Sequence, residues 1–261
     1  MSVPVDPDAV SEDDLPDDWI ETQSDAVQEV LEEMTTVYNL EGDSIEVQFD
    51  QHSYCDSEGN FIAINPLFWD EVKPPVEGPN ILRVLDDILA HEVSHYNWSD
   101  LKSKSDFSDM YPDWGDVPGH VANILEDEFV DARRMRKWYG MRSKRAYRVM
   151  LQADSPDMTP DVSEVYEDDG EVNAFLAGLH QTALYGTARG LTDAPYNLVE
   201  FCWYVEPVIE RIRRQDDPNE RFKLFHVVME MLKRYVEEPD DFDEEEYEDG
   251  TGKTVSGDPD D

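Results

Sequence analysis

Apolar residues recur three and four positions apart in several separate stretches of the chain. Residues 80–98 show the clearest pattern, with Ile81, Val84, Leu85, Ile88 and Leu89 on one face of a predicted helix. A second long helix is predicted over residues 119–139. The same spacing predicts four further helices, over 19–38 and near 170–187, 195–214 and 217–236.

Two short stretches before the first long motif alternate as strands do. Residues 44–49 and 59–65 are the predicted strands, and the turn-rich residues 56–60 between them suggest a hairpin. Residues 73–79, 99–118 and 152–169 are rich in proline or polar residues and are predicted loops. The pattern as a whole predicts an α+β fold, a mainly helical domain over residues 18–236 with a small N-terminal antiparallel or mixed sheet.

Both ends of the chain are acidic and poor in large apolar residues. Residues 1–17 and 237–261 are therefore expected to be disordered acidic arms. The acid excess is not confined to them: 62 acidic and 21 basic residues give the 261-residue chain a formal charge of −41.

Such a charge repels nucleic-acid phosphates and anionic membranes, so neither is an expected partner. No apolar run is long enough to span a membrane, and residues 1–18 lack the pattern of a signal peptide. We therefore expect a cytoplasmic protein. The spread of acids together with sparse lysine resembles the proteins of salt-in halophiles, in which dissolved salt screens the repulsion.

The motif with chemical content is His91-Glu92-Val93-Ser94-His95. Positions i and i+4 lie one helical turn apart on the same face, so both imidazoles can reach one metal ion. Glu92 lies beside the first histidine, where it can take a proton from a water at the metal. His91 and His95 also continue the apolar face of the helix, and a metal would satisfy their buried nitrogens. The motif predicts a Zn²⁺ site with Glu92 as general base.

A catalytic zinc ion usually has three protein ligands, and an acid-rich helix follows the motif. Here the chain resembles the gluzincin branch of zincin metallopeptidases, in which a glutamate on a later helix completes the site. The run from Asn123 to Asp127 carries this resemblance, which implies a zincin-like fold and Glu126 as the third ligand. Glu128, which lies nearer the apolar arc of the helix, and Asp127 remain alternatives. Either Asp127 or Asp131 is expected to orient a histidine.

Zincins often stabilise the oxyanion of the transition state with a histidine or tyrosine. His180 and Tyr185 on a later helix, and His120 at the start of the acid-rich helix, are candidates for that position. A strand at residues 61–65 is expected to form a sheet edge that pairs with an extended substrate. Cys55 and Cys202 are expected to be free thiols.

The basic residues between 133 and 148 form a cluster, for which we favour pairing with acids of the same chain over docking of an acidic partner. The sequence thus favours a zinc peptidase that acts on a protein or peptide substrate. Two alternatives are an inactive zincin-fold binding module and an acidic interaction protein or DNA mimic with a chance HExxH motif.

Overall fold

The computed structural model describes residues 17–40, 45–50, 53–56, 60–65, 79–99, 106–153 and 159–237. Over these ranges the chain is mainly helical with one small mixed sheet, as the sequence predicted. The expected acidic arms, residues 1–17 and 237–261, lie outside the described residues except for Asp17 and Glu237. Asp17 begins the first helix and Glu237 ends the last one. The elements in chain order are α1 (Asp17–Tyr38), β1 (Glu46–Phe49), β2 (Tyr54–Asp56), β3 (Phe61–Ile64), α2 (Pro79–Trp98), η3 (Pro112–Trp114), α4 (Val117–Lys137), α5 (Met141–Ala153), α6 (Val162–Asp168), α7 (Glu171–Tyr185), α8 (Tyr196–Ile212) and α9 (Pro218–Glu237).

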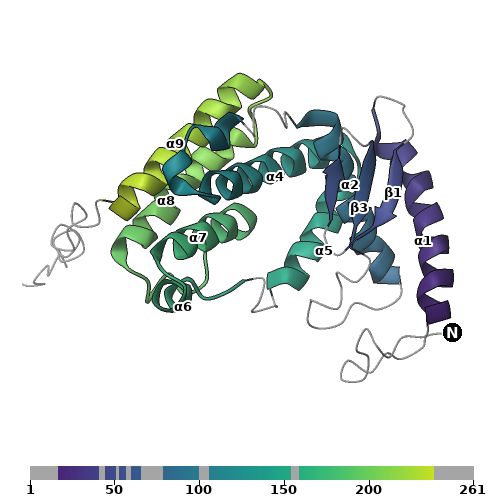
Figure 1. Ribbon diagram of the computed structural model, residues 1–261, viewed down its shortest axis with the longest axis horizontal. Coiled ribbons are helices and arrows are strands. Elements are labelled where there is room, and N and C mark those ends of the chain that lie inside the picture. Colours follow the sequence, from purple (N-terminus) through teal and green to yellow (C-terminus); the bar gives the residue numbers. More distant parts are fainter. Residues whose placement is uncertain are drawn as a thin grey trace, which may run out of the picture.

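Helix α4 runs through the middle of the molecule, packs against α7, α8 and α9, and also meets α2 (Figure 1). The sheet, α1, α2 and α5 share one hydrophobic core, in which Val47, Ile62 and Val84 are fully buried. Helices α4, α7, α8 and α9 share a second core around Phe129 and Phe201. Helices α2 and α4 belong to different cores and pack against each other. Polar side chains at the α2–α4 contact therefore lie between the two cores.

The sheet has the order β1-β3-β2, with β1 parallel and β2 antiparallel to β3. The second predicted strand has an antiparallel neighbour, as a hairpin requires, but that neighbour is β2 and not the stretch at 44–49. Asn60, directly before β3, has a φ of 57°. β3 is the central strand, so the expectation that residues 61–65 form a sheet edge is wrong. β2 is the edge on that side, and it packs against α2.

Helices α5 and α6 lie where the sequence predicted no helix. The inward face of α5 carries Met141 and Leu151 at its ends but three cations between them, so the apolar period is broken. Those cations, Lys144, Arg145 and Arg148, pair with acids of α2 and α4. The prediction that the basic cluster pairs within the chain is confirmed for these residues.

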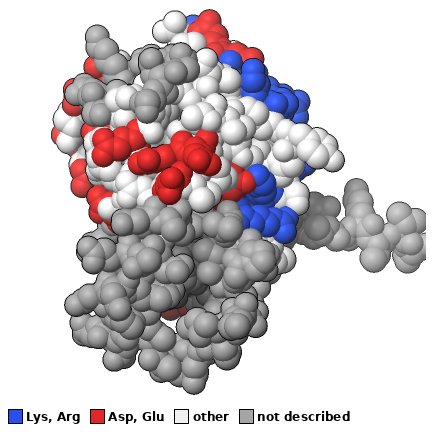
Figure 2. All heavy atoms as spheres, turned by 90° about the vertical axis from the view of Figure 1, so that its right-hand side faces the viewer, with Lys and Arg blue, Asp and Glu red and all other residues white. Residues whose placement is uncertain are grey.

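Acidic side chains dominate the end of the molecule formed by α1 and the sheet, and basic ones lie along its flank (Figure 2). Glu29, Glu33 and Glu46 are exposed there. Cys55 and Cys202 are free thiols, as expected. Among the helices within the described ranges, none combines the length and apolar character that crossing a membrane requires.

Candidate metal centre

His91 and His95 lie one turn apart on α2 and direct the same ring nitrogen to one point. Their Nε2 atoms are 3.1 Å apart, and the ring centroids are 4.7 Å apart. The side chains retain only 14% and 11% of their exposure to solvent. Helical spacing produces this placement, since Asp87, His91 and His95 follow one another on the face of α2 that meets α4.

Asp127 on α4 completes the group. Its Oδ1 atom lies 3.1 Å from Nε2 of His95 and 3.8 Å from Nε2 of His91. Among the described residues, these three form the one group of histidine, cysteine and acidic side chains whose ligand atoms are close enough to hold a metal. A tetrahedral Zn²⁺ with bonds of about 2.0–2.2 Å needs ligand atoms roughly 3.3 Å apart, which the three separations bracket. The donor set of two imidazoles and one carboxylate also suits zinc.

The far sides of the two rings are held by other residues. Nδ1 of His91 lies 2.8 Å from Asp131 Oδ1, and Nδ1 of His95 lies 2.8 Å from Ser99 Oγ. A carboxylate only accepts hydrogen bonds, so His91 donates through Nδ1. In the neutral ring that a metal ligand requires, the Nε2 lone pair would then be directed at the candidate metal position. The structure thus brings Asp131 to His91, as one of the two residues expected to orient a histidine.

Both aspartates at the site are held ionised. Burial raises the pKa of Asp131, but the charges of Arg134 and His91 outweigh it, and the pKa lies well below its usual range. Burial likewise raises the pKa of Asp127, but the hydrogen bond from His95 and the nearby histidine charges bring it below the ordinary value. Each carboxylate therefore keeps the charge that a metal ligand or a partner of a ligating histidine needs.

Glu92 is buried beside the histidines, with 7% of its surface exposed. Burial raises the pKa of its carboxyl group, although the charges of His91 and His95 oppose the change. No described residue donates a hydrogen bond to it in the structure. A general base works best when its pKa is close to the working pH, so this environment suits proton transfer.

The structure does not bring Glu126, the predicted third ligand, to the histidines. Its carboxylate is paired with buried Arg221 of α9, with Oε2 3.0 Å from Nε and Oε1 3.2 Å from Nη2. Consecutive helical residues are rotated by about 100°, so the step from Glu126 to Asp127 moves the carboxylate from the α9 side of α4 to the α2 side. The candidate third ligand is therefore Asp127 and not Glu126. Glu128, the other alternative, is paired with Arg145 and Arg213.

Of the three candidates for the oxyanion position, His180 on α7 is close enough to the site for the Asp127 charge to affect its pKa. Its ring keeps contact with solvent, yet the surrounding protein lowers the pKa of the imidazole, against the raising effect of the Asp127 charge. Burial raises the pKa of the half-buried Tyr185 on the same helix. His120 is exposed at the start of α4, about two turns before Asp127.

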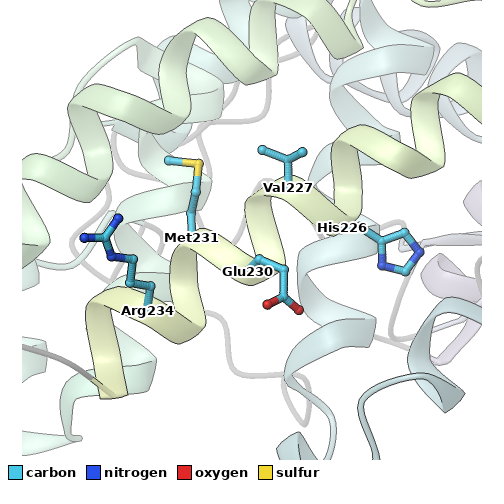
Figure 3. A pocket seen from close by; sticks show the side chains of 5 residues that line it. All are labelled: His226, Val227, Glu230, Met231 and Arg234. Carbon is cyan, nitrogen blue, oxygen red and sulfur yellow. The ribbon is translucent and has the colours of Figure 1, made fainter.

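No protein-family model, no curated protein and no solved structure matches this chain. The site therefore has to be interpreted from its own geometry. A hollow lined by His226, Val227, Glu230, Met231 and Arg234 lies elsewhere, on α9 (Figure 3). It contains none of the residues that surround the histidine pair.

Proposed function

We propose that the protein is a Zn²⁺-dependent peptidase of zincin type, with His91, His95 and Asp127 as metal ligands and Glu92 as general base. The observation that carries the proposal is the convergence of two imidazole nitrogens and one carboxylate oxygen, within 3.8 Å of one another, beside a buried glutamate. In an HExxH motif on a helix, the two histidines can bind one metal ion and the glutamate can act as general base.

A bound Zn²⁺ supplies Lewis acidity, which makes a water easier to deprotonate and polarises the carbonyl group of a substrate. The Glu92 carboxylate takes the proton of the attacking water and later gives it to the departing amine nitrogen. Asp131 and Ser99 hold the imidazoles through Nδ1, so the Nε2 atoms keep their direction during turnover.

An extended peptide has a place to bind next to these groups. β2 pairs only with β3 among the described residues, which leaves its other side as a sheet edge, and β2 packs against α2. Cys55 of β2 lies close enough to Glu92 for the glutamate charge to contribute to the raised pKa of the thiol. A substrate strand added to β2 would therefore pass beside the general base. We propose a protein or peptide as substrate on this basis.

The test compares peptide hydrolysis by zinc-loaded parent protein and by its Glu92→Gln variant. We expect the variant to keep its zinc and to lose about 10²–10⁴-fold in rate, the usual contribution of a general base. Glu33→Gln, the same change at an exposed glutamate of α1, is the matched control and should keep the parental rate.

The outcomes also separate the alternatives. Zinc binding without hydrolysis in the parent would identify an inactive zincin-fold binding module. A parent that binds no zinc would leave an acidic interaction protein with a chance motif.

A further inference from the structure

One arginine beside the candidate metal centre differs from its neighbours in how it uses its hydrogen-bond donors. Arg145 donates through Nε to Asp131 and through Nη2 to Glu128. Arg213 donates through both Nε and Nη2 to Glu128. Arg148 donates through Nε to Asp87 at 2.7 Å. Its Nη groups make no hydrogen bond to a described residue, and Nη2 forms only a longer ion pair with Asp131.

Arg148 is fixed close to the histidine pair. Its Nη2 atom lies 3.6 Å from Oδ2 of Asp131, and Oδ1 of the same carboxylate lies 2.8 Å from His91. Asp87, which anchors Nε, is fully buried, and the Arg148 side chain keeps 13% of its exposure. The guanidinium is therefore rigidly held at one end and retains open donors at the other.

The charge of Arg148 reaches residues on two sides of the site. Burial raises the pKa of Glu92 on α2 and of Tyr185 on α7, and the Arg148 charge opposes both changes. Burial lowers the pKa of His180 on α7, and the Arg148 charge adds to that change. The Arg148 charge is therefore felt both by the general base on α2 and by residues of α7.

We propose that the Nη groups of Arg148 bind a carboxylate of the substrate and make the enzyme selective for peptides that carry one near the cleaved bond. This inference rests on the proposed peptidase function. A guanidinium presents two parallel N–H donors that match the two oxygens of a carboxylate, and such pairs are stronger than neutral hydrogen bonds. The carboxylate can come from an acidic side chain or from the C-terminus of the peptide.

Three peptide probes test this proposal by calorimetric binding to the Glu92→Gln protein, which leaves them uncleaved. The first is an acetylated alanine tetrapeptide amide, which has no charge. The second is the same peptide with a free C-terminal acid, and the third is the amide with one alanine replaced by aspartate. We expect at least one acidic probe to bind about tenfold more tightly than the neutral one, as a charged hydrogen-bonded pair provides. The stronger acidic probe identifies the source of the carboxylate.

The preference should disappear when Arg148→Met is added and should persist with Lys144→Met, which removes another cation from the same face of α5. Arg148→Lys keeps the charge beside Asp87 if the methionine variant does not fold, and loss of the two-donor fork should reduce the preference. Equal binding of all three probes, or an undiminished preference in the Arg148 variants, overturns the proposal.

Zinc content and hydrolysis by the protein with Glu92 intact are measured separately. If the acidic probes bind more tightly but the protein holds no zinc and hydrolyses no peptide, the Arg148 subsite stands and the peptidase proposal is refuted. If the protein hydrolyses peptides but binds all three probes equally, the peptidase proposal stands and the Arg148 subsite is refuted.

Discussion

At the residue scale, Asp131 is the group on which the candidate centre depends most. Its carboxylate accepts from Nδ1 of His91 and from the guanidinium groups of Arg134 and Arg145. It therefore connects one imidazole of the candidate metal centre to a buried set of ion pairs. A neutral amide at this position could still contact the ring but could not hold the same charge.

We expect Asp131→Asn to weaken zinc binding by about 10–100-fold, the usual effect of losing such a partner of a ligating histidine. Chelator competition measures this affinity. The control is Asp113→Asn, which makes the same change at an exposed aspartate of η3 and should bind zinc as the parent does. Parental affinity in the Asp131 variant would show that the hydrogen bond to His91 does not tune the metal site.

A second residue-scale prediction concerns Glu126, whose partner is the buried Arg221. Glu126→Gln should keep zinc binding, because the carboxylate is not a ligand. It should lower the free energy of unfolding by about 3–5 kcal/mol, because the charge of Arg221 is left buried without its partner. Chemical denaturation and zinc titration of one preparation measure both effects. Loss of zinc with stability retained would restore Glu126 as the ligand.

The histidines and Glu92 could be identified from sequence because their spacing is local and lies on one helical face. Asp127, the proposed third ligand, could not, because its placement depends on the rotation of α4 about its axis. That rotation is set in part by Arg221, 95 positions after Glu126, which holds the glutamate on the α9 side. The Asp127 side chain is also half-exposed. In the sequence it therefore cannot be told apart from an ordinary acid on the solvent-facing side of a helix.

At the scale of the elements, α5 shows where hydrophobic periodicity stops predicting structure. Its inward face contacts α2 through Lys144 with Asp86 and through Arg148 with Asp87. Long helices with apolar faces, such as α2, were predicted almost to the residue. The helix held by charge and the three-residue strand β2 were missed, because neither has an apolar period long enough to detect.

This charge contact predicts how stability depends on pH. Burial raises the pKa of Asp87, but the charges of Arg134 and Arg148 outweigh it and the pKa is lowered. A lowered pKa contributes stability above the unfolded-state value of about 3.9, and that stability is lost as the pH falls through the folded-state value. Urea unfolding between pH 7 and pH 3 should show the parent more stable than Asp87→Asn at neutral pH, with the difference shrinking below about pH 4. A difference that does not change with pH would contradict this explanation.

At the scale of the whole molecule, the formal charge of −41 opposes compaction. The buried ion pairs around α5 use several of the few cations, so the surface acids have little left to pair with inside the chain (Figure 2). Added salt reduces the repulsion between exposed acids much more than it weakens buried pairs.

We expect the thermal unfolding midpoint to rise steadily between 0.1 M and 1 M KCl, because the screening length falls from about 10 Å to about 3 Å over that range. Calorimetry at each salt concentration measures this. The same titration with a neutral osmolyte in place of salt separates screening from general exclusion effects. A midpoint that is flat or falls with salt would refute the interpretation of the acid excess as salt adaptation.

The most direct test of the metal centre is the zinc content of protein that has been stripped, reloaded and dialysed, measured by elemental mass spectrometry. The parent should retain one zinc ion per chain, and Asp127→Asn and His95→Ala should each lose it while their circular dichroism stays parental. Zinc retained at full occupancy without the Asp127 carboxylate, or a folded parent that takes up none, would contradict the site described here.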